Sequence, residues 1–345
     1  MKKSSITDDQ VVSYQYISSG STLLDLAISG GRIRGGGLPG RTIVEIFGPP
    51  SSGKSAIVAE AAGNAQRSGG QSLIADPEAR LDTEYCKIYG IHIDPSIYFT
   101  PPTVTAVFAR LIGPVEKDGR ALSKAWTPDP TNVNVYVVDS LAALSTDMEI
   151  EKGDAMGQRR AKEFSEGFRL TGIHIKQHNI LFLATNQVRE AIGSYVKAYD
   201  SPGGMALKHY TKIRIQLTGI KNIEETISVR DIEQKRIIGI ELTAKVVKNQ
   251  AGVPLRSVPI YIVFNYGIDD VKANLKWLMD NGGFPLEEGR KRSSYTINDK
   301  KFISLDAASK YVEENRLEQE IKGRVIDLWE EIEGQFKPTR VKRRE

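Results

Sequence analysis

Apolar residues recur in two alternating patterns over the first half of the chain. Short runs that are almost wholly apolar are typical of buried strands; they occupy residues 42–48, 71–76, 133–144 and 179–187. Between them, apolar residues three and four positions apart predict amphipathic helices; these occupy residues 21–28, 54–69, 81–90, 105–115 and 154–178. Strands that alternate with helices predict an α/β fold with a mostly parallel central sheet.

The second half of the chain has a different order of elements. Three β-rich segments, at 212–220, 236–249 and 258–265, follow one another with few helical residues between them, and we expect them to add antiparallel strands to the same sheet. From about Tyr266, helical patterns at 269–283 and 306–336 flank a strand pair near 293–303. We therefore expect a short N-terminal arm at 1–16, a core at 17–265, a small C-terminal α+β domain at 266–336 and a basic tail at 337–345. Residues 113–132 are rich in glycine and proline and are interpreted as a surface insertion.

Composition narrows the class of protein. The 345 residues contain one cysteine, Cys86, which excludes an internal disulfide framework and favours a reducing cytoplasm. No apolar run approaches the roughly 20 residues that span a bilayer, and the N-terminus lacks the apolar segment of a secretory signal. A net charge of +4 is too small to indicate nucleic-acid binding by itself. The tail "KPTRVKRRE" is locally basic, and either a solvated end or a DNA contact explains it.

The segment "GPPSSGKS" lies between an apolar strand and an amphipathic helix. It matches the pattern of a phosphate-binding loop, in which backbone N–H groups surround phosphate oxygens at the start of a helix. Lys54 would reach the β- and γ-phosphates, and the Ser55 hydroxyl would hold Mg²⁺. A glycine-rich turn with no ligand is the alternative. The expected phosphate-binding residues are Gly48, Pro49, Pro50, Ser51, Ser52, Gly53, Lys54 and Ser55.

Acidic residues at strand ends supply the rest of an expected nucleotide site. Asp139 ends the apolar run "VYVVD" and would hold the magnesium ion, although it would equally cap a following helix. Asp76 and Glu78 follow another strand, at the edge of a parallel sheet where ligands bind. Glu78 is our candidate for the general base that activates water, with an ordinary surface charge as the alternative.

The motifs "ISSGSTLLDLAI", "GGLPGRTIVEIFGPPSSGKS", "DPEARLDTEYCKIYGI", "VYVVDSLAAL", "EIEKGDAMG", "TNQVREAIG", "GGMALKHY" and "KVVKNQAGVP" follow one another in this order. Together they resemble the RecA recombinase family from about Ile17 to Trp329. The sequence is similar to the bacterial members but divergent, which suggests a phage-encoded form acting in the host cytoplasm. The resemblance implies a DNA-dependent ATPase with ATP and Mg²⁺ that forms helical filaments on single-stranded DNA.

The same resemblance implies homologous pairing and strand exchange with duplex DNA, in recombination and DNA repair. Single-strand-binding and mediator proteins are further expected partners. A RecA-fold ATPase of another class, such as a hexameric helicase or a recombination mediator, is the main alternative. A filamentous scaffold that binds nucleotide with little catalysis is a third.

The resemblance assigns roles within the nucleotide site. Glu78 falls on the catalytic glutamate, and Asp82 and Tyr85 fall on positions that contact adenine. Gln187 falls on the residue that senses the γ-phosphate and transmits the nucleotide state to a DNA-binding loop. Lys248 matches a lysine that acts on the γ-phosphate of the neighbouring subunit. The expected catalytic set is therefore Lys54, Glu78, Gln187 and Lys248, with Lys208, Arg214, Lys248 and Gln250 at the subunit interface.

Two segments, 151–160 and 189–204, match the loops that grip DNA in the family. Met156 and Ile192 fall where apolar side chains separate base triplets, and nearby cations would contact phosphates. Ordinary local packing is the alternative for both apolar residues. The expected DNA-binding residues are Met156, Gly157, Arg159, Arg160, Arg189, Ile192, Gly193, Lys197, Gly203 and Gly204.

Several positions depart from the bacterial pattern. Gln250 replaces a second lysine that acts across the interface, which puts the hydrolysis rate in doubt. Only "VVSYQY" remains of the N-terminal element that docks on the next subunit. Thr218-Gly219 replaces an arginine pair that helps to hold a second DNA, and the basic tail replaces an acidic one. Tyr195 and Val196 lie near a position that carries phenylalanine in the bacterial proteins.

Overall fold

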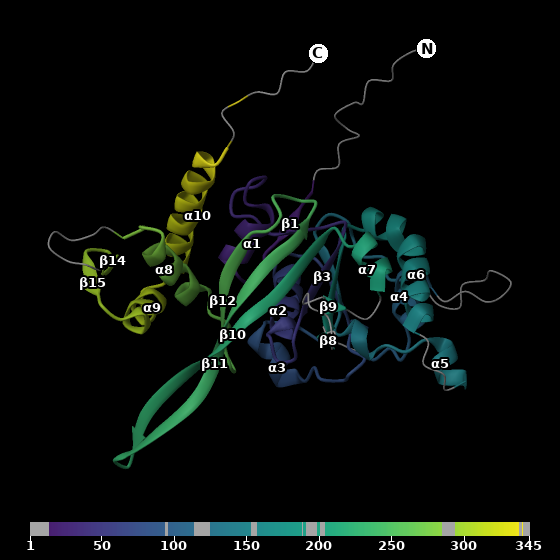
Figure 1. Ribbon diagram of the computed structural model, residues 1–345, viewed down its shortest axis with the longest axis horizontal. Coiled ribbons are helices and arrows are strands. Elements are labelled where there is room, and N and C mark those ends of the chain that lie inside the picture. Colours follow the sequence, from purple (N-terminus) through teal and green to yellow (C-terminus); the bar gives the residue numbers. More distant parts are fainter. Residues whose placement is uncertain are drawn as a thin grey trace.

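The chain is organised around one large sheet with helices on both faces (Figure 1). The computed structural model describes residues 14–93, 96–113, 125–152, 157–187, 189–190, 199–200, 204–284, 294–337 and 340. Within these residues, nine strands form the sheet: β3 (Thr42–Gly48), β4 (Ser72–Ala75), β5 (Tyr98–Phe99), β6 (Asn134–Val138), β7 (Ile180–Gln187), β10 (Ile213–Val229), β11 (Ile232–Asn249), β12 (Ser257–Val263) and β13 (Gly267–Ile268). Their order is β13-β12-β11-β10-β3-β7-β6-β4-β5.

The strands divide into a parallel part and an antiparallel part. All neighbours from β5 to β10 pair in parallel, whereas β10 to β13 pair antiparallel. This arrangement confirms the predicted α/β fold with a mostly parallel sheet and added antiparallel strands. The carboxyl ends of β3, β6 and β7 lie at one edge of the sheet, which is where ligands bind in open α/β folds.

Two apolar clusters hold the helices against the two faces of the sheet. Helices α1 (Thr22–Ser29) and α2 (Lys54–Arg67) belong to the first cluster, with Val44, Ile46 and Leu183 beneath them. Helices α4 (Val104–Ile112), α6 (Gly157–Gln177) and α7 (Gly204–Tyr210) cover the other face, where Phe108 and Phe182 stack with ring centroids 6.0 Å apart. Alternate residues of each strand enter opposite clusters, as the two-residue period of a strand requires. Two short helices, α3 (Thr83–Ile88) and α5 (Asp147–Lys152), connect the layers.

The C-terminal segment packs beside the antiparallel end of the sheet (Figure 1). It comprises α8 (Asp270–Asp280), the strand pair β14 (Tyr295–Ile297) and β15 (Lys300–Phe302), α9 (Leu305–Glu314) and α10 (Glu318–Gln335). Its buried residues, including Val325 and Trp329, are continuous with the cluster that contains α1. Among the described residues, none of the helices has the length and apolar character that a membrane span requires.

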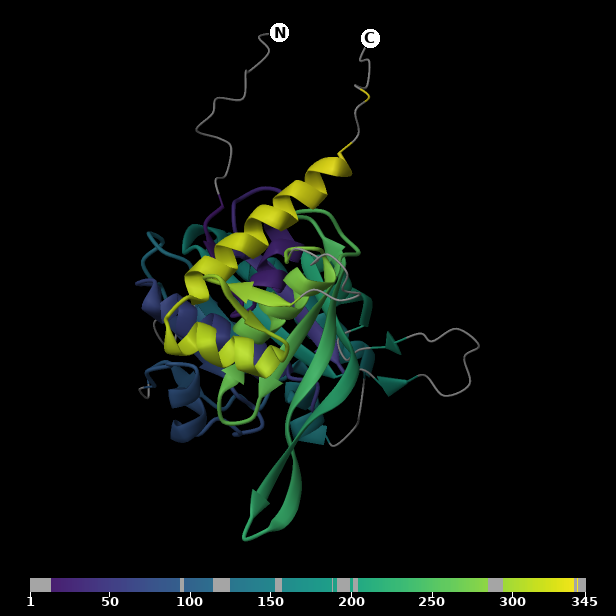
Figure 2. The same ribbon diagram turned by 90° about the vertical axis from the view of Figure 1, so that its left-hand side faces the viewer.

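The antiparallel pair β10–β11 is much longer than the sequence pattern predicted. The expected strands at 212–220 and 236–249 continue to Val229 and Ile232, where a two-residue turn at Arg230 and Asp231 joins them with φ of 52° and 64°. The outer part of this hairpin projects away from the body of the molecule (Figures 1 and 2). Both of its faces are exposed, so its residues do not show the alternation of buried and exposed positions by which a half-buried strand is recognised.

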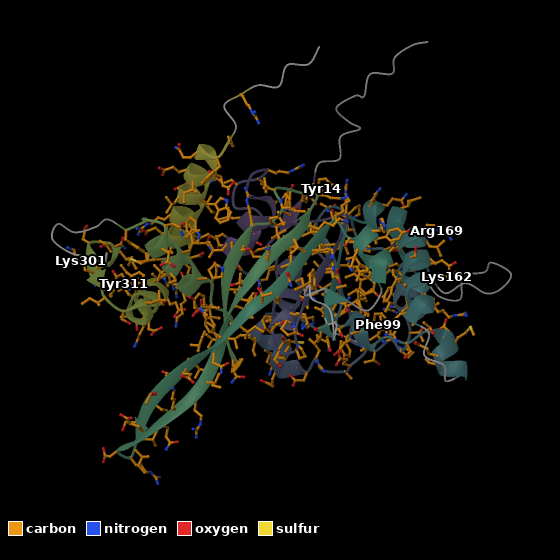
Figure 3. The ribbon with its side chains drawn as sticks, in the orientation of Figure 1. Tyr14, Phe99, Lys162, Arg169, Lys301 and Tyr311 are labelled. Carbon is orange, nitrogen blue, oxygen red and sulfur yellow. The ribbon has the colours of Figure 1, made fainter. Side chains whose placement is uncertain are left out.

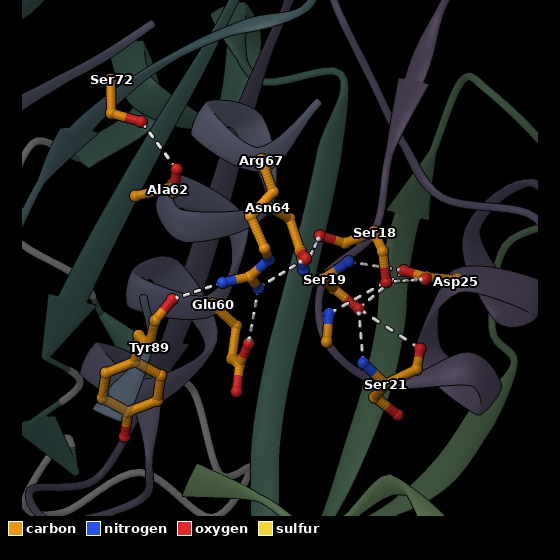
Figure 4. A network of polar contacts seen from close by, with 11 residues as sticks. Ser18, Ser19, Ser21, Asp25, Glu60, Ala62, Asn64, Arg67, Ser72 and Tyr89 are labelled. Carbon is orange, nitrogen blue, oxygen red and sulfur yellow. Dashed lines mark hydrogen bonds and ion pairs between the residues drawn. The ribbon is translucent and has the colours of Figure 1, made fainter. Parts of the chain in front are cut away.

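A buried carboxyl group fixes the start of the fold. Asp25 accepts hydrogen bonds from the Ser18 hydroxyl at 2.6 Å and from the Ser19 N–H and hydroxyl at 2.8 and 2.7 Å (Figure 4). Burial nevertheless outweighs these bonds and raises the pKa of Asp25 from 3.8 to about 6. The carboxyl group therefore binds its proton more tightly in the folded chain than in the unfolded chain.

We expect Asp25→Asn to make stability less dependent on pH. A carboxyl group with a raised pKa stabilises the fold when protonated, so its contribution is complete below about pH 3.8 and is lost as the pH rises to about 6. The difference corresponds to roughly 3 kcal/mol. Urea unfolding between pH 4 and pH 7 measures the slope, and Asp306→Asn, at an exposed side chain, is the matched control. An unchanged slope in the Asp25 variant would contradict this assignment.

Candidate functional site

The loop between β3 and α2 has the geometry of a phosphate-binding loop. Ser51 and Gly53 adopt positive φ angles of 56° and 79°, which turn the chain sharply into the N-terminus of α2. The φ of Gly53 favours glycine, and a Cβ atom there would lie 2.2 Å from Ile262 Cδ1, so a larger residue would also displace that side chain. The loop therefore presents the N-terminal N–H groups of a long helix to the edge of the sheet, which is a ready anion site.

Lys54 lies inside this loop. Its Nζ donates to the Gly48 carbonyl at 3.2 Å, to the Pro49 carbonyl at 2.7 Å and to Ser52 Oγ at 3.4 Å. Burial lowers the pKa of Lys54, while the nearby Asp139 raises it. The ammonium group is thus held in the loop by neutral carbonyl groups that a phosphate would replace with full negative charge.

Asp139 directly follows β6 and faces the start of α2. Its carboxylate accepts hydrogen bonds from Ser55 and from Thr185 Oγ1, and burial raises the pKa of Asp139. A hydroxyl and a carboxylate side by side are hard oxygen ligands of the kind that Mg²⁺ prefers. The described residues contain no group of three or more His, Cys, Asp or Glu that could hold a metal. Because Mg²⁺ usually keeps several waters and binds one or two protein oxygens together with substrate phosphates, Ser55 and Asp139 are ligands of a suitable kind for it.

The two acidic residues that follow β4 have different environments. Asp76 is buried and accepts from the N–H groups of Arg80 at 2.7 Å and Leu81 at 2.8 Å, so it shapes the loop. Glu78 instead reaches the cavity, where Ser140 Oγ donates to its Oε1 at 2.9 Å and Arg80 pairs with its Oε2. Of the two, Glu78 lines the cavity that contains the phosphate loop, whereas Asp76 lines a smaller cavity beside it.

One cavity of about 970 Å³ joins these residues. Its lining includes residues 50–56 of the loop together with Glu78, Asp139 and Gln187. Gln187 is the last residue of β7 and pairs with Gly48 of β3, so its position at the cavity follows from the register of two central strands. Strands that are distant in the sequence thus bring together four polar groups. They are the ammonium group of Lys54, the carboxylates of Glu78 and Asp139, and the amide of Gln187.

A smaller cavity of about 170 Å³ continues beside α2 and α3. Tyr85 lines both cavities, and its ring lies 4.8 Å from that of Tyr89. This apolar, aromatic environment suits a planar base. Asp82 has a different position, because it caps α3 and its Oδ1 accepts from the Tyr85 N–H at 2.7 Å.

The residues expected to contact DNA are only partly described. Met156, Ile192, Gly193, Lys197 and Gly203 lie outside the described residues. Arg159 and Arg160 lie in the first turns of α6, where Arg160 pairs with Glu149 at 3.2 Å and Arg159 with Glu163 at 3.6 Å. Gly157 begins α6 and Gly204 begins α7.

The second expected DNA loop begins on a short strand pair. Arg189 opens β8 (Arg189–Glu190), which pairs antiparallel with β9 (Tyr199–Asp200). This strand pair starts two residues after Gln187.

The residues expected at a subunit interface form a separate group. Arg214 lies opposite Lys248 in the β10–β11 register, and Lys248 Nζ donates to the Lys208 carbonyl at 2.7 Å. Arg214 also pairs with the fully buried Glu45 at 2.5 Å. Gln250 is exposed just beyond β11 and donates its N–H to the Lys212 carbonyl at 3.0 Å. None of these four residues lines the cavity described around Lys54.

Sequence reasoning missed several residues of the site. Ser140 and Thr185 hold the carboxylates of Glu78 and Asp139 through hydrogen bonds between different strands. Ile220, Ile237 and Phe264 form one wall of the large cavity. Placing these five residues in the site required the strand order. For Ser140 alone the sequence contained a signal, because it directly follows Asp139.

The fold and the cavity define an α/β protein with a P-loop at the carboxyl edge of its parallel strands. Residues 2–269 match the family model described as the RecA N-terminal domain. The chain is 30% identical to "Protein RecA" of Streptococcus parasanguinis over 299 residues, which cover 84% of this chain and 73% of that protein. It is 31% identical over 307 residues to "Protein RecA" of Lactococcus lactis subsp. cremoris, covering 87% of this chain and 72% of that protein. The chain therefore belongs to the RecA family, whose ATPase domain implies ATP hydrolysis.

Proposed function

We propose that this protein is a homologous recombination protein that binds ATP, assembles as a helical filament on single-stranded DNA and exchanges strands with a homologous duplex. One observation carries the proposal. The cavity that contains Lys54, Glu78 and Asp139 also contains Gln187, and Gln187 leads within two residues into the Arg189 strand. The expected nucleotide site and the expected DNA loop therefore follow one another directly in the chain, at the end of β7.

Hydrolysis in this proposal depends on the position of Glu78. Its carboxylate accepts from Ser140 and faces the cavity, so it would accept a proton from a water molecule that attacks the γ-phosphate. Lys54 and the loop N–H groups would hold the phosphates in place. Ser55 and Asp139 would hold Mg²⁺, which neutralises phosphate charge when it is bound.

Gln187 would couple the nucleotide to DNA. Its amide can donate to a γ-phosphate oxygen and loses that bond after hydrolysis, so β8 and the loop that follows would respond to the nucleotide state. The cations Arg159, Arg160 and Arg189 would then contact DNA phosphates. For Arg160 this requires that DNA phosphate replaces its pairing with Glu149.

Lys248 would act on a neighbouring subunit. Within its own chain Lys248 lies opposite Arg214. Arg214 in turn lies beside Glu45 of β3, three residues before Gly48, so this pair of residues is away from the phosphate edge of the sheet. Burial and the charge of Arg214 lower the pKa of Lys248. A cation in this place would reach a γ-phosphate only across a contact between copies, as an arginine finger does.

ATP turnover measured with and without single-stranded DNA tests the proposal, together with negative-stain images of the same samples. We expect DNA to stimulate turnover and helical filaments to form. Closed rings would indicate a RecA-fold ATPase of another class. Filaments without turnover would indicate a scaffold, for which the uncharged Gln250 would be the physical reason.

We expect removal of residues 337–345 to weaken duplex-DNA binding and to reduce its dependence on salt. The tail carries several lysines and arginines, and each phosphate that they neutralise releases counterions. Without the tail, the salt slope should therefore fall by about 1 for each phosphate that is no longer neutralised. Fluorescence anisotropy of a labelled duplex across a salt series measures both quantities. Equal affinities and equal slopes for the truncated and full chains would rule out a role of the tail in DNA capture.

A further inference from the structure

The β10–β11 hairpin extends past the edge of the sheet at which the nucleotide cavity lies. β10 runs parallel to β3 and pairs with it only from Ile213 to Gln216, which is level with Phe47. β3 then ends in the phosphate loop, whereas β10 continues to Val229. At about 3.3 Å per residue, the strand reaches roughly 40 Å beyond this edge. We call residues 224–237 the outer hairpin.

Apart from Ile237 at its base, the outer hairpin lines neither cavity, and nearly all of its residues are exposed. β10 pairs with β3 only as far as Gln216, and β11 pairs with β12 only between Gly239 and Lys245. Among the described residues, neither strand of the outer hairpin therefore has a partner on its outer edge. Its side chains extend on both faces into open space (Figure 3). A two-stranded ribbon without packing is at best marginally stable in water, so a partner that covers it would stabilise it.

The two faces of the outer hairpin differ in composition. Val229 lies opposite Ile232, and Ile227 lies on the same face one pair further along; these side chains are 48%, 62% and 51% exposed. The other face carries Ser228 opposite Glu233 and Thr226 opposite Lys235. One face is therefore apolar at the tip, and the other is polar.

The charges of the hairpin favour a protein partner over nucleic acid. Between Lys221 and Arg236 there are four lysine or arginine residues and four aspartate or glutamate residues. Lys235 Nζ and Glu224 Oε2 form an ion pair across the two strands at 2.6 Å. A segment with balanced charge gains little from counterion release, which dominates DNA binding.

The residues at the base of the hairpin indicate which protein the partner is. Ile220, Ile237 and Phe264 line the large cavity beside the phosphate loop, and their side chains are 36%, 49% and 51% exposed. In the proposed filament, a second copy of the chain covers this edge of the sheet. A ribbon that projects roughly 40 Å from the same edge must then lie against that second copy.

We propose that the outer hairpin is an intersubunit arm, whose apolar face formed by Ile227, Val229 and Ile232 docks on the neighbouring copy of this chain. The inference rests on the proposed function, because it requires a filament whose subunits meet over the nucleotide cavity. It adds a contact that strengthens assembly without taking part in chemistry.

Ile232→Asp tests the arm, with Ser228→Asp as the matched control at the opposite face of the same tip. Both positions are exposed, so both variants are expected to fold and to bind a fluorescent ATP analogue like the wild type. With the non-hydrolysable analogue and a long oligo(dT), we expect Ile232→Asp to need at least about tenfold more protein for half-saturation. Ser228→Asp should match the wild type within about twofold.

Three outcomes are informative. Equal assembly by Ile232→Asp and the wild type, when the wild type forms filaments, overturns the arm but leaves the proposed function standing. Failure of the wild type to form filaments removes the proposed function and the arm together. Weaker binding of Ile232→Asp to an oligo(dT) that holds a single subunit would show a DNA contact and would also overturn the proposal.

A cross-link identifies the occupant directly. The chain's single cysteine, Cys86, is buried, so a Cys86→Ala, Ile232→Cys protein can be labelled at the tip with a maleimide photocross-linker. We expect covalent dimers and larger multimers only when nucleotide and DNA are both present. Attachment to the oligonucleotide instead of protein, or multimers from a Ser228→Cys control in equal yield, would contradict docking through the apolar face.

Discussion

Glu78→Gln is expected to abolish ATP turnover while the protein still binds ATP. Glutamine keeps the size of the side chain and accepts the Ser140 hydrogen bond, but its amide cannot take a proton from water. Loss of a general base typically lowers the rate by about 10²–10⁴-fold. Because the phosphate loop is untouched, nucleotide affinity should stay within a few fold of the wild type.

The variant should also remain on DNA in its ATP-bound form. If hydrolysis is what releases the bond between Gln187 and the γ-phosphate, a protein that cannot hydrolyse ATP keeps its DNA loop in the binding state. Release of labelled single-stranded DNA after dilution, in the presence of ATP, measures this effect. We expect the wild type to dissociate and Glu78→Gln to dissociate far more slowly.

Glu84→Gln is the matched control, because Glu84 is a nearby, exposed carboxylate that pairs only with Lys87 at 2.6 Å among the described residues. Its turnover should be that of the wild type. Normal turnover in Glu78→Gln would exclude Glu78 as the base, and Asp139, the remaining carboxylate of the cavity, would become the group to test.

The parts of the fold that depend on local periodicity could be predicted. The core strands β3, β6 and β7 are buried on both faces and therefore appear as continuous apolar runs, and Gly48–Ser55 carries its own motif. The α/β class and the phosphate loop both follow from such local signals. Asp139 could be placed for the same reason, because it ends one of these runs.

The parts that depend on strand order could not be predicted. Glu45 interrupts an apolar strand without any local explanation; in the structure it accepts from Asn186 at 3.0 Å and pairs with Arg214, on the two strands that flank β3. Asp76 and Glu78 follow the same strand, and the hydrogen bonds of Asp76 to the N–H groups of its own loop could not be read from the sequence. The outer hairpin was missed because a ribbon exposed on both faces has no buried periodicity.

Lys54→Ala is expected to weaken nucleotide binding itself rather than the chemical step. In the structure Lys54 donates to the Gly48 and Pro49 carbonyls, and it is only 8% exposed. When phosphates occupy the loop, the same ammonium group exchanges these neutral acceptors for charged ones, and such charge-assisted bonds are about twice as strong. Their loss should weaken ATP affinity by roughly 10- to 100-fold.

The measurement that distinguishes Lys54→Ala from Glu78→Gln is thermal stabilisation by a non-hydrolysable ATP analogue. Ligand that binds only the folded state stabilises it by RT ln(1 + [L]/Kd), so at one ligand concentration Glu78→Gln should be stabilised like the wild type and Lys54→Ala clearly less. Lys87→Ala, at an exposed lysine of α3, controls for the loss of one positive charge. Full stabilisation of Lys54→Ala would mean that the loop N–H groups and the dipole of α2 suffice to hold the phosphates, and the ammonium group would then serve the transition state instead.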